Sequence, residues 1–321
     1  MFFNSVKKGD NSPIQYITTI VLVFMGYAFG YVNLYSIIWI KMQYDNSIGT
    51  DALNEFSKNP DFTILNINQN IGFLILLSIF VFALAGLYLG ITFVHKRNFK
   101  SLFAFNERID WRRYFWSTSV WFLILITIEV ISFLINPDNY TFQKPTFQFI
   151  FLIIISLVIL PLQTSFEELF IRGYIFQSIG YNTKNIYIGF IFSIVIFAFM
   201  HSGNPEISNY GYFKMMSYYI VAGLILGLLI IYDDRIELAI GVHSATNMFG
   251  AVMLTYEGAA IQTASLFKTK EVDPLLLSFQ FLIAGIFFIF LASKKYNWKL
   301  ITKANFYKKL NSNEFKNSDT V

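Results

Sequence analysis

The chain has 321 residues, of which 55% are hydrophobic and only 14% are charged, and its net charge is +4. Soluble domains carry about 25% charged residues, so this composition excludes a soluble globular protein and indicates a polytopic membrane protein. The sequence contains no cysteine, which excludes disulfides, thiolate zinc ligands and a cysteine nucleophile, and the small, dispersed charge argues against nucleic-acid binding.

Apolar segments follow one another along the chain and predict an all-α fold, a polytopic transmembrane helical bundle of about eight spans. The first segment is too long for the core of a signal peptide and no small-residue cleavage pattern follows it, so it is interpreted as a span. Residues 41–70 are predicted to be a mainly polar loop. In chain order the predicted spans are 14–40, 71–94, 114–135, 147–160 with its continuation past Pro161, 185–200, 212–232, 237–256 and 274–293.

Pro161 interrupts the fourth apolar segment just before two adjacent glutamates. Proline lacks the N–H that a helix interior requires, and its ring clashes with the preceding turn, so the helix should kink or break here. Broken helices are a common way to present polar groups at membrane depth. We therefore expect a kinked helix at the functional site.

The lysines and arginines predict how the spans are oriented. Eight spans put both termini on one side of the membrane, and 17 of the 24 basic residues fall on that side, six on the other, and Arg172 within the membrane. Cytoplasmic loops of membrane proteins are enriched in Lys and Arg. We therefore expect both termini to be cytoplasmic.

The fourth span carries three ionisable residues, Glu167, Glu168 and Arg172. An ionisable side chain near the centre of a span costs about 2.5–3.5 kcal/mol on insertion scales, so a functional site is the default interpretation. Glu168 and Arg172 are four residues apart in the favourable acid-before-base order, which predicts an ion pair on one helix face with a structural or supporting role. This pairing leaves Glu167 without a local partner.

Three further polar residues are predicted to reach the depth of Glu167. At a rise of 1.5 Å per residue from the cytoplasmic turns, Glu167 lies about 20 Å deep, His201 about 24 Å, His243 about 12 Å and Asn247 about 18 Å. His243 and Asn247 are four residues apart and share a helix face. Four polar side chains from three helices should therefore converge within the bilayer.

Peptide-bond hydrolysis by an activated water fits these groups. Glu167 is the candidate general base, because a carboxylate in an apolar cavity is a stronger base near neutral pH. His201 would share the water or protonate the leaving amine. His243 and Asn247 would donate hydrogen bonds to the developing oxyanion.

Three motifs in these segments resemble those of a known family. EELFIR at 167–172 fits an EExxxR motif, FAFMH at 197–201 fits FxxxH, and HSATN at 243–247 fits HxxxN. The chain resembles the CAAX protease and bacteriocin-processing (CPBP, or Abi) family of intramembrane glutamic endopeptidases. The resemblance implies a membrane helical bundle in which Glu167 and His201 activate water and His243 and Asn247 form an oxyanion hole.

The sequence leaves several alternatives open. Glu167, Glu168, His201 and His243 could in principle hold zinc, but the spacing lacks the HExxH pattern, and we expect neither a metal nor a cofactor. A proton-coupled transporter would need inverted internal repeats, which are not visible, and a non-catalytic membrane scaffold is a third hypothesis. The expected partners are the lipid bilayer and a peptide or membrane-protein substrate, in a bacterial cell (inner) membrane.

The motifs divide the chain into three regions. Residues 1–146 form an N-terminal three-span region with the polar loop 41–70, and residues 147–256 form the catalytic core. Residues 257–321 contain the last span and a basic cytoplasmic tail. The first and third regions lie outside the motifs and could select the substrate.

Overall fold

The computed structural model describes residues 2–58 and 60–298. Apart from three short strands, the regular structure of these residues is helical. The α-helices are α1 (Pro13–Tyr44), α2 (Thr50–Lys58), α3 (Gln69–Leu89), α4 (Trp111–Ile135), α5 (Gln148–Val158), α6 (Leu160–Glu168), α7 (Gln177–Asn182), α8 (Ile186–Met200), α9 (Pro205–Tyr210), α10 (Tyr212–Asp233), α11 (Glu237–Val252) and α12 (Pro274–Lys295). The 3₁₀ segments are η1 (Phe2–Lys8), η2 (Phe62–Leu65), η4 (Phe99–Leu102) and η5 (Pro137–Asn139), and the π-helices are η3 (Gly90–Val94) and η6 (Leu169–Phe176).

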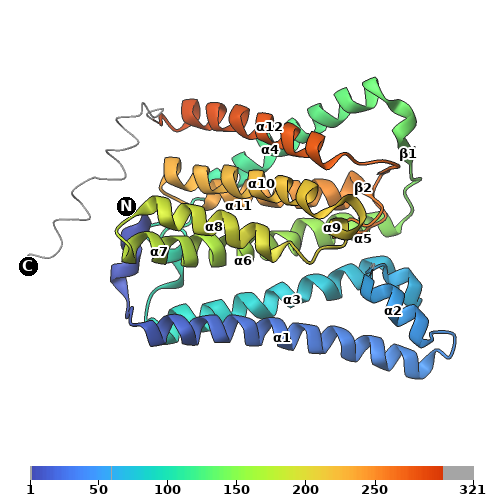
Figure 1. The fold of residues 1–321 in the computed structure, drawn as a ribbon, viewed down its shortest axis with the longest axis horizontal. Helices are drawn as coiled ribbons and strands as arrows, with labels where there is room; N and C mark the ends of the chain where they lie inside the picture. The colour runs from blue at the N-terminus through green and yellow to red at the C-terminus, as the bar shows by residue number, and fades with distance from the viewer. Residues whose placement is uncertain (1, 59, 299–321) are drawn as a thin grey trace, which may run out of the picture.

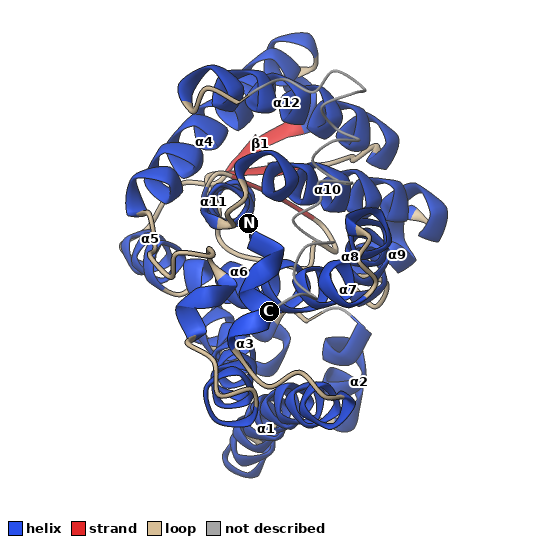
Figure 2. Ribbon diagram, turned by 90° about the vertical axis from the view of Figure 1, so that its left-hand side faces the viewer, coloured by secondary structure: helices blue, strands red, loops and turns tan. Residues whose placement is uncertain are grey.

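The helices form one bundle with α11 near its centre (Figures 1 and 2). In Figure 1, α1 and α3 lie side by side on one flank, and α4 and α12 lie on the opposite flank. Gly26 and Gly86 allow the close approach of α1 and α3, because a Cβ at either position would lie within 2.4 Å of a backbone oxygen of the other helix. Twelve of the 16 residues of α11 are buried, against two of the 25 residues of α4. The central position of α11 places the HxxxN motif inside the molecule.

The all-α polytopic fold predicted from the composition is confirmed. Helices occupy all eight predicted places, and six helical segments are long and apolar enough to cross a membrane: 13–44, 69–94, 111–135, 148–182, 212–233 and 274–295. The other two places hold α8, with 15 residues, and α11, with 16. The total of eight spans therefore stays a prediction.

Large apolar side chains cover the outer faces of the long helices. Phe24 on α1, Leu123 on α4 and Phe279 on α12 are each about 60% exposed in the isolated chain. Surfaces of this kind are stable where lipid rather than water surrounds them. The arrangement agrees with a multi-pass membrane protein.

The segment 41–70 is more structured than the predicted polar loop. It contains the amphipathic helix α2 and the 3₁₀ segment η2, and Phe56 and Phe62 are buried with ring centroids 4.9 Å apart. These rings pack with Ile48 and Leu65 onto the ends of α1 and α3. The average composition of the segment is polar, because charged residues separate the apolar ones. The apolar residues nevertheless lie on one face of the folded segment, which average composition does not indicate.

The helix of the fourth span is interrupted next to Pro161 but continues beyond it. The helical pattern is interrupted at Ile159, between α5 and α6, and α6 runs directly into the π-helix η6 after Glu168. π-helical turns inside α-helices are rare and are frequent at functional sites. Both irregularities flank the two glutamates and position them differently from a straight helix.

A small sheet closes the end of the bundle that lies far from the described N-terminus (Figure 1). Its strands are β1 (Tyr140–Phe142), β2 (Leu254–Tyr256) and β3 (Phe267–Thr269), in the order β1-β3-β2. β1 is antiparallel to β3 and β2 is parallel to it. The sheet ties the connection after α4 to the segment that follows α11.

The two ends of the described chain meet at the opposite end of the bundle. The backbone N–H of Phe2 donates to Asp234 Oδ1 (3.1 Å), and Trp298 Nε1–H donates to Asp233 Oδ1 (3.0 Å). This arrangement requires an even number of membrane crossings between them. The predicted basic tail begins within the described residues, where Lys294 and Lys295 end α12, and its part beyond residue 298 lies outside them, as does the residue at position 1.

One hydrophobic core joins the three regions predicted from the motifs. It includes Val23 and Trp121 from the N-terminal region, Ile171 and Val242 from the central region, and Phe288 from α12. The three regions therefore pack as one unit in the described part of the chain. The boundaries drawn between them remain a prediction.

Candidate functional site

The predicted ion pair between Glu168 and Arg172 is present and fully buried. Arg172 Nη1 donates to Glu168 Oε1 at 2.8 Å, and neither side chain is exposed to solvent. The same Glu168 oxygen also accepts from His243 Nδ1–H at 2.8 Å. Glu168 therefore connects α6 to both the following π-helix and α11. It holds a histidine as well as the arginine that its spacing predicted.

Glu167 has a local partner that the sequence did not reveal. Gln163 lies one helical turn earlier on α6, and its Nε2–H donates to Glu167 Oε1 at 2.6 Å. The second carboxylate oxygen, Oε2, is buried, accepts no hydrogen bond from the described residues and lies 3.4 Å from His243 Nε2. One oxygen of Glu167 is thus fixed by the protein while the other faces the imidazole of His243.

Asn247 joins the same network through Gln163. Its Nδ2–H donates to Gln163 Oε1 at 2.9 Å, one turn of α11 beyond His243. Thr164 on α6 and Ser244 on α11 share a further hydrogen bond of 2.6 Å beside it. The predicted convergence of α6 and α11 is therefore present, and the amide of Gln163 is the element that completes it.

His201 lies beside this network without a hydrogen bond to it. Its Nδ1–H donates to the Phe197 carbonyl oxygen at 2.7 Å, and no hydrogen bond in residues 2–58 and 60–298 joins it to Glu167 or His243. Its imidazole stacks on the ring of Tyr219, with centroids 4.4 Å apart. The structure therefore leaves Nε2 as the nitrogen of His201 that is available for chemistry.

Phe197, the first residue of the FxxxH motif, connects His201 to the charged cluster. Its ring centroid lies 4.4 Å from that of His201 and 5.8 Å from that of His243. The Arg172 guanidinium lies 4.3 Å from the centre of the same ring, within the range of a cation–π interaction. An aromatic ring at this position thus contacts one residue from each of the three motifs.

Acidic and basic side chains alternate in the cluster. Glu168 lies between Arg172 and His243, and His243 lies between Glu168 and Glu167. Buried charges are tolerated only when they are paired and hydrogen-bonded in this way. Within the described ranges no three His, Asp or Glu side chains are arranged to hold a metal ion.

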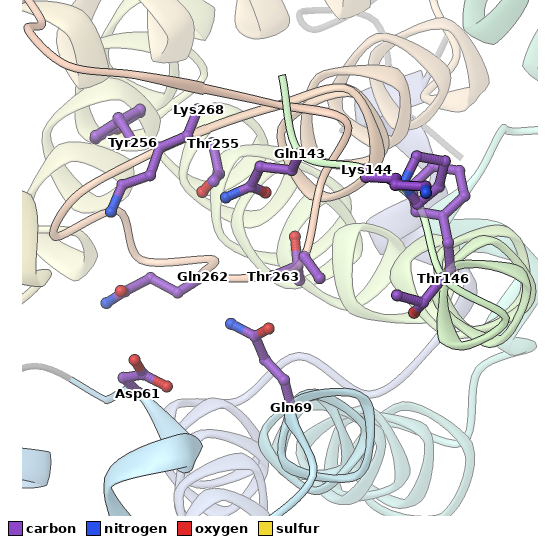
Figure 3. Close-up of a pocket in the computed structure, with 13 residues that line it drawn as sticks. Asp61, Gln69, Gln143, Lys144, Thr146, Thr255, Tyr256, Gln262, Thr263 and Lys268 are labelled. Carbon is purple, nitrogen blue, oxygen red and sulfur yellow. The ribbon is translucent and has the colours of Figure 1, made fainter. Parts of the chain in front are cut away.

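Two cavities lie apart from the cluster. One, of about 280 Å³, is lined by polar residues from three distant segments, including Asp61, Gln69, Gln143 and Lys268 (Figure 3). The other, of about 640 Å³, is mainly apolar, lies against α4, α11 and α12, and contains Glu129, whose Oε2 accepts from the Tyr140 hydroxyl at 2.8 Å. Neither cavity is lined by the predicted catalytic residues.

Two comparisons relate this chain to known proteins. A family model described as type II CAAX prenyl endopeptidase Rce1-like matches residues 146–249. An uncharacterized protein of Bacillus subtilis, YyaK, is 32% identical over 203 residues, which cover 63% of this chain and 68% of that protein. No solved structure matches. With its motifs, its membrane helices and these matches, the chain belongs to the family of Rce1-like CAAX proteases, the CPBP family of membrane endopeptidases.

Proposed function

We propose that this protein is an intramembrane endopeptidase that hydrolyses a peptide bond with a water activated by Glu167. The observation that carries the proposal is the position of the Glu167 carboxylate. It is 5% exposed, one oxygen is held by Gln163, and the other lies 3.4 Å from His243 Nε2 without accepting a hydrogen bond. A buried, oriented carboxylate with one free oxygen is suited to accept a proton from water.

The reaction follows from the groups around this oxygen. Glu167 Oε2 takes a proton from water while the oxygen of that water bonds to the carbonyl carbon of the substrate. The carbonyl oxygen becomes an oxyanion, which accepts hydrogen bonds from His243 Nε2–H and from the amide of Asn247. The proton that Glu167 accepted passes to His201 Nε2, and His201 gives it to the leaving amine as the carbon–nitrogen bond breaks, which restores Glu167 and His201 to their starting states. Glu168 and Arg172 have a supporting role, since Glu168 orients the His243 ring.

The substrate class follows from the setting of the site. The cluster lies on helices that line the interior of a membrane bundle, so we propose a peptide or a membrane-protein segment as substrate. We propose a bacterial cell membrane as the location of the protein. The lysine and arginine distribution supports an orientation with both termini in the cytoplasm. The proposed chemistry requires no metal or cofactor.

The proposal is tested by comparing peptide termini in membranes and medium from cells that carry the wild-type chain or Glu167→Gln at equal abundance. Glutamine keeps the shape of the side chain but removes the base, so specific termini should disappear in the variant. Glu129→Gln is the matched control, because Glu129 is also a membrane carboxylate but lies outside the cluster. This control should give the wild-type profile.

Two outcomes would contradict the proposal in different ways. Cleavage retained by Glu167→Gln would overturn the role of Glu167 while leaving a peptidase. Identical termini in wild type, variant and cells lacking the protein would contradict hydrolysis itself. Proton-coupled uptake into vesicles would then support a transporter, and an effect that survives loss of Glu167 and His201 together would support a scaffold.

A further inference from the structure

A second buried carboxylate lies next to the site but outside the motifs. Glu206, on the short helix α9 between α8 and α10, is only 3% exposed. Its Oε1 accepts a short hydrogen bond from the Tyr219 hydroxyl and a longer one, of 3.5 Å, from Asn204 Nδ2. Asn204 Nδ2 also donates to the Tyr219 hydroxyl oxygen at 2.9 Å. The phenol of Tyr219 is therefore held by two polar side chains.

The ring of Tyr219 is the one that stacks on His201. The two ring centroids are 4.4 Å apart with an angle of 27° between the planes, and Phe197 contacts the same imidazole at 4.4 Å. With Nδ1 bonded to the Phe197 carbonyl oxygen, the plane of the imidazole is set by two aromatic rings and one hydrogen bond. A chain of contacts thus runs from Glu206 through Tyr219 to His201.

Several groups surround the Glu206 carboxylate. Burial raises the pKa of Glu206 above its ordinary value, and hydrogen bonds from the Tyr219 hydroxyl, from the backbone N–H groups of Glu206 and Ala260 and from Asn204 lower it. The titratable and charged groups that face it are Tyr210 on α9, Tyr218 and Tyr219 on α10, Tyr256 on β2 and, through Tyr210, Glu257. An apolar residue at position 206 would leave the buried Tyr219 hydroxyl and the Asn204 amide without this acceptor, so the carboxylate fixes both side chains beside His201.

We propose that Glu206 is a positioning residue for His201 that acts through the Tyr219 hydroxyl. The hydrogen bond fixes the rotation of the Tyr219 ring, the ring fixes the plane of the imidazole, and the plane sets the direction in which Nε2 points. The inference rests on the proposed function, in which His201 protonates the leaving amine. It goes beyond that function because it assigns a positioning role to α9, the short helix that connects α8 to α10.

The kinetic test uses the full-length protein in lipid bilayers with a substrate identified by its cleaved termini. Glu206→Leu and Tyr219→Phe should each lower kcat by about 10- to 100-fold at unchanged KM, because small displacements of a catalytic group have effects of this size. The double variant should be no slower than the slower single variant, since both remove the same interaction. Glu206→Gln, which can still accept the hydroxyl hydrogen bond, should retain more activity than Glu206→Leu.

Tyr210→Phe is the matched control. Tyr210 also faces Glu206, but its hydroxyl donates to the Glu257 carbonyl oxygen and its ring contacts Tyr256 rather than His201. This variant should keep the wild-type kcat. Additive losses in the double variant, or an equal loss in Tyr210→Phe, would overturn the proposal in favour of a general structural role for the connection.

A spectroscopic test is independent of any substrate. The chain contains three histidines, so ¹⁵N signals of their rings can be assigned by substituting each in turn. Glu206→Leu and Tyr219→Phe should shift the ring signals of His201 and leave those of His95 unchanged. Unchanged His201 signals would overturn the positioning role even if activity falls. If the His201 signals shift but the protein has no peptidase activity, the positioning role stands and only the proposed hydrolysis is refuted.

Discussion

Gln163 shows how a neutral residue can organise a charged site. Its side chain donates to Glu167 Oε1 and accepts from Asn247 Nδ2, so one amide sets the orientation of residues from two motifs. A neutral glutamine beside two glutamates is not singled out by the cost of burying a charge, which identified Glu167 and Glu168. The only signal in the sequence is its spacing, four residues before Glu167, which places both side chains on one helix face.

Replacing Gln163 should slow the reaction without removing the base. Gln163→Met keeps the length of the side chain but leaves Glu167 Oε1 and Asn247 Nδ2 without partners, so we expect kcat to fall by about 10- to 100-fold. The measurement is the cleavage rate at equal protein abundance. Gln280→Met is the control, because Gln280 lies on α12 and bonds to Ser132 away from the cluster. An unchanged rate in Gln163→Met would contradict the orienting role.

At the scale of elements, the packing of α11 against α4 holds the HxxxN motif in place. Gly241 is the contact point, since a Cβ there would lie 1.8 Å from Ser117 Oγ and 2.7 Å from the Tyr114 carbonyl oxygen. Close helix approach at small residues is the usual packing device in membranes, where lipid is as apolar as leucine. The position of His243, two residues later, depends on this approach.

Enlarging Gly241 should therefore destabilise the bundle. Gly241→Ala forces α11 away from α4, and we expect a loss of about 1–3 kcal/mol in the free energy of unfolding, visible as a lower thermal midpoint in detergent. Gly250→Ala is the control on the same helix, because a Cβ there meets no atom within 4 Å. It should be neutral or slightly stabilising, since alanine favours helix more than glycine does. Equal midpoints for both variants would contradict the close-packing interpretation.

At the scale of the whole molecule, the two described ends lie together on the α10–α11 turn, which constrains the topology. The contacts of Phe2 and Trp298 with Asp234 and Asp233 place both ends at one face of the bundle, and the small sheet marks the other face. From the distribution of lysine and arginine we propose that the first face meets the cytoplasm. Which compartment each face meets is therefore a proposal that labelling can test.

Single cysteines provide that test, because the natural chain has none. Lys144→Cys and Lys100→Cys change exposed residues at opposite faces of the bundle. A membrane-impermeant maleimide added to intact cells should label position 144 and spare position 100, and permeabilised cells should label both. Labelling of position 100 alone in intact cells would reverse the proposed orientation.

The sequence by itself determined the class of fold, the places of the apolar helices, the irregularity next to Pro161 and the pairing of Glu168 with Arg172. These features depend on composition and on contacts within one helix, which periodicity and spacing report.

Only the tertiary structure decided which polar atoms meet between helices. The bridge through Gln163, the bond from His243 to Glu168, the folded segment 41–70 and the burial of Glu206 all depend on contacts between residues far apart in the chain. A sequence pattern places a side chain on a face and at a depth. The atom it contacts depends on how neighbouring helices are rotated and tilted, which packing of the whole bundle sets.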